Sequence, residues 1–192
     1  MVIDVGTGDG TFVYKSARLN PQRLYIGVDA NARPLEKISE KIHRSSQKGG
    51  MPNAVFVKAA VESLPDELNG VANQVHVHFP WGSLLSVVAK GDMVMLRNLR
   101  RICAVSATLE IVASLDPERD RAEMQRLGLE ALSLEYLDFV LTPRYKDAGF
   151  TVAKRGILSP RECMRLETAW AKRLSSSDRT VWHIVARAVE PE

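Results

Sequence analysis

The chain has 192 residues, with 26 basic and 23 acidic side chains and a formal net charge of only +3. This length predicts a single domain over residues 1–192, with enough chain for a sizeable hydrophobic core. Because the sequence has neither a run of about 18 apolar residues nor a visible signal peptide, we expect no membrane span and no export.

The first predicted elements enclose a glycine-rich loop. A short apolar strand is expected over residues 1–5 and a helix over Thr11–Leu19. Between them Gly6, Gly8 and Gly10 lack the Cβ that would keep a ligand away from the backbone. The third glycine comes one residue sooner than in the dinucleotide fingerprint, in which phosphate binds at the helix start. The strand begins almost at the first residue, so we expect that a segment preceding it is absent.

Acidic residues around this loop indicate the kind of ligand. Asp4 and Asp9 suit a ligand with a positive centre and no phosphate, which describes S-adenosylmethionine. Asp29 follows the second predicted strand, residues 24–28, and lies 19 residues after Gly10. An acid at that distance reaches ribose hydroxyls in nucleotide-binding α/β folds. We therefore predict an S-adenosylmethionine site, and an ordinary strand-to-helix loop of another α/β protein is the alternative.

The remaining predicted elements alternate between helices and strands. The helices are expected over residues 33–44, Ser83–Lys90, Met93–Ile102, 117–127, 134–148 and 160–174. The strands are expected over Ala54–Lys58 and residues 75–79, 107–113, 151–156 and 181–189, and a polar loop over 45–53. This alternation predicts an α/β fold of the Rossmann-like kind. We expect a mostly parallel seven-stranded sheet with an antiparallel last strand and helices on both faces.

Cysteines and histidines give no metal motif. Cys103 and Cys163 are neither spaced for a metal nor arranged as a disulfide framework, which favours a reducing cytoplasm. His76 and His78 alternate along a strand and so share a face, but no third ligand lies nearby in the sequence. We therefore expect no metal site.

Two tryptophans stand where a nucleic-acid base could bind. Trp81 lies between a proline and a glycine at the end of strand 75–79, and carboxyl ends of strands are where α/β sheets bind ligands. Trp170 lies within residues 151–187, which hold eight bases against three acids. An aromatic ring flanked by cations is typical of a base-flipping pocket, so the two rings are predicted to hold one base. A core tryptophan and a solvated basic helix face are the alternatives.

Taken together, the motifs resemble the aminoglycoside-resistance 16S rRNA (adenine-N1) methyltransferases. The tracts that carry the resemblance keep their order along the chain and are residues 4–10, 48–50, 60–65, 79–82 and 170–174. The resemblance implies a class I S-adenosylmethionine-dependent methyltransferase that acts on the decoding-site adenine of 16S rRNA in the 30S subunit. A weaker resemblance is to the tRNA guanine-N7 methyltransferases, which also carry an aromatic Pro-Trp tract after the fourth strand.

The family resemblance implies a role for each matching position. Trp81 and Trp170 would hold the target adenine as the catalytic residues. Cofactor contacts are implied for Asp4, Gly6, Gly8, Asp29, Ala60, Val61, Glu62 and Ser83. Contacts to rRNA are implied for Arg44, Lys48, Thr168, Lys172, Arg173 and Arg179. The loop that carries Arg44 and Lys48 has serines at positions 45 and 46, so it holds fewer basic residues than the family pattern leads us to expect.

Other functions remain open at this point. A small-molecule methyltransferase would share the cofactor site, although the compact chain and the basic C-terminal tract argue against it. A binding protein could keep the rRNA surface and barely catalyse. We expect a monomeric enzyme of the cytoplasm.

Overall fold

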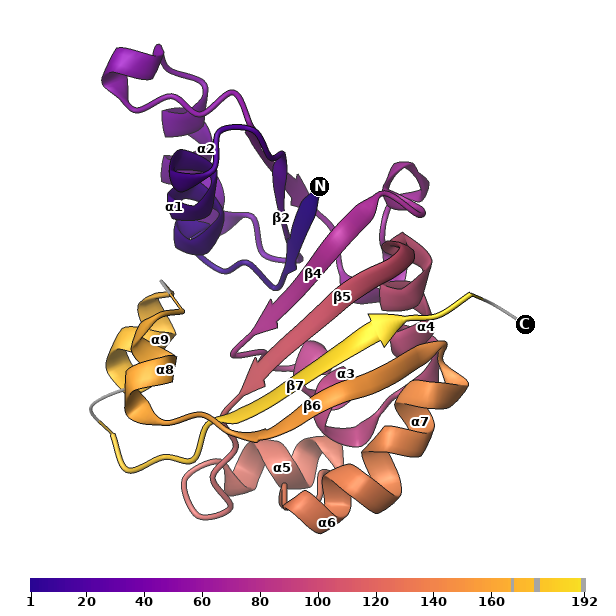
Figure 1. The fold of residues 1–192 in the computed structure, drawn as a ribbon. Helices are drawn as coiled ribbons and strands as arrows, with labels where there is room; N and C mark the ends of the chain where they lie inside the picture. Colours follow the sequence, from indigo (N-terminus) through magenta and orange to yellow (C-terminus); the bar gives the residue numbers. More distant parts are fainter. Residues whose placement is uncertain (167, 175–176, 191–192) are drawn as a thin grey trace.

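The described residues of the computed structural model form one seven-stranded sheet in the order β3-β2-β1-β4-β5-β7-β6 (Figure 1). The structure describes residues 1–166, 168–174 and 177–190, without the side chains of Ala169 and Lys172. The strands are β1 (Val2–Val5), β2 (Tyr25–Asp29), β3 (Ala54–Lys58), β4 (Ala72–His78), β5 (Cys103–Ala113), β6 (Phe150–Ile157) and β7 (Trp182–Ala188). The first five strands pair in parallel, whereas β7 runs antiparallel between β5 and β6. The predicted mixed sheet with an antiparallel last strand is confirmed.

Helices cover both faces of this sheet. They are α1 (Thr11–Leu19), α2 (Glu36–Ile42), α3 (Ser83–Lys90), α4 (Met93–Ile102), α5 (Arg121–Leu127), α6 (Leu134–Tyr136), α7 (Thr142–Asp147), α8 (Pro160–Met164) and α9 (Ala169–Leu174). Side chains alternate across a strand. Val2 therefore packs with α1 and α2 on one face, and Ile3 joins the larger core with α3, α4 and α7 on the other. No helix among the described residues is long and apolar enough to cross a membrane.

The strand order places a crevice at one edge of the sheet. After β1 the chain builds β2 and β3 outward on one side, and then crosses back to add β4 and β5 on the other. Loops that leave β1 and β4 therefore diverge at the carboxyl ends of these two strands. In open α/β sheets this is the point where ligands bind.

The starts of β4 and β5 were predicted wrongly, whereas the other strand ends lie within one residue of their predicted bounds. β4 begins at Ala72 rather than at residue 75, and ends at His78 rather than at residue 79. β5 begins at Cys103 rather than at residue 107, and Ala72 pairs with Cys103 before a register shift. Polar residues and a bulge interrupt the apolar alternation at these strand starts, so the pattern detects only the regular part.

Four of the predicted helices also differ from the structure. The helix expected over residues 134–148 consists of α6 and α7 joined by a π-helical segment, Leu137–Leu141. The helix expected over residues 33–44 is a 3₁₀ turn, Arg33–Leu35, followed by α2, and the one expected from residue 117 begins at Arg121. The helix expected over 160–174 is divided into α8 and α9. Both cysteines, Cys103 and Cys163, are buried and have free thiols.

Candidate functional site

A cavity of about 640 Å³ lies at the carboxyl ends of β1, β2 and β4. All eight residues for which cofactor contacts were predicted line its wall. These are Asp4, Gly6, Gly8, Asp29, Ala60, Val61, Glu62 and Ser83. They come from four separate segments of the chain, and the fold brings them together at the crevice between the two halves of the sheet.

The glycine loop follows β1 and is tied to β2. Gly6 and Gly8 have φ angles of 78° and 59°, in the left-handed region that side chains with a Cβ rarely adopt. A Cβ on Gly8 would meet no atom within 4 Å, so its backbone stands open. The amides of Gly8 and Asn31 each donate to the carboxylate of Asp29 at 2.8 Å. Because a carboxylate has about four acceptor positions, Asp29 still has acceptor capacity for a ligand.

Asp4 is a buried carboxyl group at the floor of this cavity. Its residue is only 3 % exposed, and its Oδ1 has no hydrogen-bond partner within the described part of the chain. Burial raises the pKa of Asp4 above its usual range, while the neighbouring His78 ring acts in the opposite direction. A cation placed beside Oδ1 would stabilise the ionised form. The amino group and the sulfonium centre of S-adenosylmethionine are both cations, so this wall fits that cofactor.

Another part of the wall is a short 3₁₀ turn, Val61–Ser63, which Asn98 of α4 holds in place. The Asn98 side-chain amide donates to the carbonyls of Val61 and Glu62 at 3.0 and 3.1 Å. Val61 is buried and Glu62 is exposed. This turn offers an apolar surface beside a carboxylate, which suits a base with amino hydrogens.

A second cavity of about 240 Å³ adjoins the first. Its wall consists of Phe79, Pro80, Trp81, Ser114, Asp120, Trp170, Leu174 and Arg179. The two cavities share Phe79, Pro80, Trp81 and Trp170.

Two of the three tryptophans are exposed at this site, and the third is buried. Trp81 and Trp170 are 57 % and 54 % exposed, whereas Trp182 on β7 is 7 % exposed and belongs to the core. Large aromatic rings exposed to this extent at the wall of a cavity are typical of binding surfaces. The alternative of a core role for Trp81 and Trp170 is therefore wrong.

A strained turn presents Trp81. Phe79 has a φ of 50°, and its amide donates to the carbonyl of Val112 at 2.7 Å. A bulky residue in this conformation costs about 1–3 kcal/mol and persists only where surrounding contacts impose it. The turn directs the chain off the end of β4, and Gly82 (φ 61°) then leads into α3, whose first residue is Ser83.

Trp170 belongs to a pair of short helices that pack against Val112, near the carboxyl end of β5. Ser159 begins α8 with a capping box that it forms with Glu162, and the Thr168 hydroxyl accepts the Ala171 amide at 2.9 Å to begin α9. The guanidinium carbon of Arg173 lies 5.6 Å from the centre of the Trp170 ring. Thr168 and Arg173 also line the larger cavity. The side chain of Lys172, for which an rRNA contact was predicted, lies outside the described residues.

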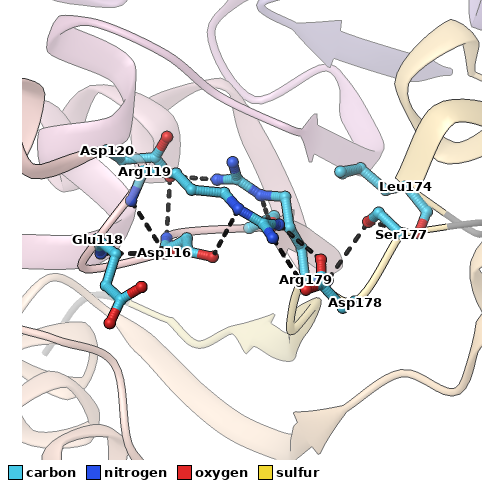
Figure 2. Close-up of polar contacts among 9 residues, drawn as sticks. Asp116, Glu118, Arg119, Asp120, Leu174, Ser177, Asp178 and Arg179 are labelled. Carbon is cyan, nitrogen blue, oxygen red and sulfur yellow. Dashed lines mark hydrogen bonds and ion pairs between the residues drawn. The ribbon is translucent and has the colours of Figure 1, made fainter.

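An ion-pair network fixes the segment that follows α9 (Figure 2). The Arg179 guanidinium pairs with the buried carboxylate of Asp120 and donates to Ser114 Oγ at 3.1 Å. Next to it, Arg119 binds both carboxylate oxygens of Asp178 at 2.6 and 2.8 Å. Sequence reasoning missed Asp120 because its partner is distant along the chain. The structure places Arg179 on the wall of the smaller cavity, and its phosphate contact stays a prediction.

Arg44 and Lys48 are exposed on the loop after α2. Gly49 accepts a hydrogen bond from the Tyr14 hydroxyl at 3.0 Å, which ties this loop to α1. In Figure 1 the loop, the helices α1 and α2, and the α8–α9 pair follow one another down the left side. The predicted basic residues therefore fall on segments that project from one side of the molecule.

Comparisons with known proteins show the family of this chain. The sequence profile of the NpmA family, described as 16S rRNA (adenine(1408)-N(1))-methyltransferase, matches residues 1–189. A protein of that description from Streptoalloteichus tenebrarius is 40 % identical over 177 residues, which are 92 % of this chain and 81 % of the relative. The chain belongs to this family. An Escherichia coli member is 37 % identical over 90 % of this chain and 80 % of its own length.

Solved structures of similar proteins share the fold. The aminoglycoside resistance methyltransferase NpmB1 is 46 % identical, with a TM-score of 0.87 over 98 % of this chain and 86 % of its own. A variant of the 16S rRNA (adenine(1408)-N(1))-methyltransferase from Catenulisporales acidiphilia, solved with cosubstrate SAM, is 34 % identical. It gives a TM-score of 0.89 over 100 % of this chain and 86 % of that one. The predicted Rossmann-like methyltransferase fold is thereby confirmed, as is the family resemblance.

Proposed function

We propose that this protein transfers the methyl group of S-adenosylmethionine to N1 of adenine 1408 in 16S rRNA, within the 30S subunit. The observation that carries the proposal is the pair of adjoining cavities whose common wall includes Trp81 and Trp170. Membership of the 16S rRNA (adenine(1408)-N(1))-methyltransferase family identifies the base. The larger cavity would take the cofactor and the smaller one the flipped base.

Residues of the larger cavity fit the parts of the cofactor. Asp4, with its unpartnered buried oxygen, would face the methionine end, and Asp29 would accept from the ribose hydroxyls. The adenine would lie against Ala60 and Val61, with its amino group toward Glu62. When bound, the cofactor supplies an electrophilic methyl group on a sulfonium centre.

Catalysis on this base needs positioning more than proton transfer. Neutral adenine carries an in-plane lone pair and no proton at N1, so no general base is required. The protein would hold N1 in line with the methyl group at about 3–3.5 Å. Because the product base is cationic, the faces of Trp81 and Trp170 would stabilise the positive charge as it develops.

Basic residues outside the cavities would position the protein on rRNA. Arg44 and Lys48 on one projecting loop and Lys172 and Arg173 on α9 are proposed to contact phosphates, with Arg179 at the pocket wall. Such contacts fix orientation and carry no sequence information. The shape of the assembled subunit would then select the base. We propose a monomeric enzyme of the cytoplasm, where 30S subunits are.

Primer extension on 30S subunits treated with the protein and S-adenosylmethionine tests the proposal. N1 methylation blocks base pairing, so reverse transcriptase should stop next to adenine 1408. Binding of cofactor and subunit without a stop would refute catalysis and leave an rRNA-binding homologue.

Two further substrates separate this function from its rivals. Methylation of free small molecules, with none on 30S subunits, would indicate a small-molecule methyltransferase. Methylation of tRNA, with none on 30S subunits, would indicate a tRNA guanine-N7 enzyme. The comparisons do not favour the tRNA enzyme, because the relatives described above act on 16S rRNA by name.

A further inference from the structure

Three of the four histidines in the chain gather around one carboxylate, outside the predicted RNA surface. His76 and His78 come from β4, Glu110 from β5 and His183 from β7. His76 pairs directly with Glu110 across the two parallel strands, and His183 lies on the neighbouring antiparallel strand. Sequence reasoning excluded a metal because no third ligand stood near the two histidines, but the sheet supplies it.

The spacing of the ligand atoms matches a tetrahedral zinc site. His76 Nδ1 lies 2.9 Å and His78 Nε2 lies 3.5 Å from the same oxygen, Glu110 Oε2. One ligand atom from each of these three residues lies within 4.8 Å of the other two. Zinc bonds of about 2.0–2.1 Å imply neighbouring ligand atoms about 3.3 Å apart. The two separations from Glu110 Oε2 bracket this value.

The ring nitrogens of His78 have no hydrogen-bond partner among the described residues, so hydrogen bonds alone do not account for the cluster. The side chain of His78 is only 4 % exposed, and neither ring nitrogen has a hydrogen-bond partner within the described residues. Its ring contacts Phe12 edge-on, with centroids 4.9 Å apart, so packing fixes its orientation. Buried polar atoms are normally paired, and each exception requires an explanation such as an ion.

Glu110 is prepared to bind a cation. Its carboxylate oxygen Oε2 faces both His76 Nδ1 and His78 Nε2. His183 Nε2 lies 2.9 Å from the other oxygen, Oε1, where it orients the carboxylate. Metal sites commonly hold a ligand through such an outer hydrogen bond.

Solvent reaches the cluster from one face of the sheet. The side chains of Glu110 and His76 are 25 % and 15 % exposed. In Figure 1, α3 and α4 lie behind the sheet; on the histidine side, Phe12 of α1 contacts the rings of His76 and His78 and leaves Glu110 partly exposed. An ion could therefore enter without unfolding the core.

We propose that His76, His78 and Glu110 bind one Zn²⁺, with His183 as the positioning residue and water in the fourth position. Imidazole and carboxylate ligands in this number suit zinc, and three protein ligands with one open position are a usual zinc arrangement. The ligands come from adjacent strands, so the ion would join β4 to β5 close to the place where the antiparallel part of the sheet begins. Zinc should therefore raise the thermal stability of the folded chain.

Calorimetric titration of tag-free, chelator-treated protein with zinc chloride near neutral pH tests the site. We expect one-to-one binding and a higher melting temperature with zinc. His78→Gln and Glu110→Gln should weaken binding by at least about 100-fold, and His183→Gln by about 10–100-fold as an outer partner. His43→Gln, on an exposed histidine elsewhere, should bind as the wild type does.

Two results would overturn the site. One is absence of stoichiometric zinc binding by the folded wild-type chain, which would make the cluster a hydrogen-bond network only. The other is equal affinity in the wild type, His78→Gln and Glu110→Gln. Circular dichroism checks that each variant folds, and His76→Gln replaces any that does not. Anomalous diffraction from zinc-soaked crystals gives an independent answer, since the ion must lie between His76, His78 and Glu110.

Discussion

Replacing Trp81 or Trp170 by alanine should abolish most methylation while leaving the protein folded. Each ring is more than half exposed, so its loss should lower the free energy of unfolding by less than the roughly 3–5 kcal/mol typical of a core tryptophan. Stacking contributes about 1–3 kcal/mol per base, and about 1.4 kcal/mol corresponds to a factor of ten. Each alanine variant should therefore lose about 5- to 150-fold in kcat/KM on 30S subunits.

Phenylalanine variants and the third tryptophan provide matched controls. Trp81→Phe and Trp170→Phe keep an aromatic face and should retain part of the activity. Trp182→Ala removes a ring that is 7 % exposed and should lower the melting temperature sharply. If both exposed rings hold one base, the double alanine variant should show coupling of about 0.5–3 kcal/mol rather than simple additivity.

The assay pairs methyl transfer from labelled cofactor to 30S subunits with thermal unfolding of each variant. Wild-type turnover in either alanine variant would refute the assignment of the rings to the target base. So would a fall in melting temperature as large as that of Trp182→Ala, because loss of activity would then follow from unfolding.

Three further predictions follow from other parts of the site. Asp29→Ala should weaken S-adenosylmethionine binding by about 10–100-fold by calorimetry, because charge-assisted hydrogen bonds contribute about 1.5–3 kcal/mol each; unchanged affinity would contradict the ribose assignment. Arg44→Glu and Lys48→Glu should each lower the affinity for 30S subunits and reduce the slope of log affinity against log salt concentration by about 0.7–0.9. Lys146→Glu on α7 is the control, and a slope equal to that of the control would show that Arg44 and Lys48 make no phosphate contact. Ser159→Ala removes a helix cap and should lower the free energy of unfolding by about 1 kcal/mol, and chemical denaturation giving no change would show that the capping box is dispensable.

Local sequence signals predicted the cofactor side of the site. The glycine loop and Asp29 are recognisable because their conformational and hydrogen-bonding requirements act over a few residues. The exposure of Trp81 was also predictable, since a Pro-Trp-Gly tract after a strand packs poorly into a core. The same logic failed at the start of β4, where a bulge breaks the apolar alternation.

Contacts between distant segments were not predictable in this way. Asp120 and Arg179 are 59 residues apart, and no local pattern marks either as the partner of the other. His76 and Glu110 are 34 residues apart and meet only through strand register. Strand order and register therefore carried information that neither composition nor periodicity contains.

The common wall of the two cavities has a consequence for inhibitor design. A nucleoside in the larger cavity and a flat heterocycle in the smaller one would lie in adjoining spaces that share Trp81 and Trp170 on their walls, so a short linker could join them. Linking the two groups makes the second binding step intramolecular, so affinity rises without any new contact. Other enzymes that use S-adenosylmethionine but lack two tryptophans beside the cofactor cavity would bind only the nucleoside part of such a compound. The heterocycle would therefore make the compound selective.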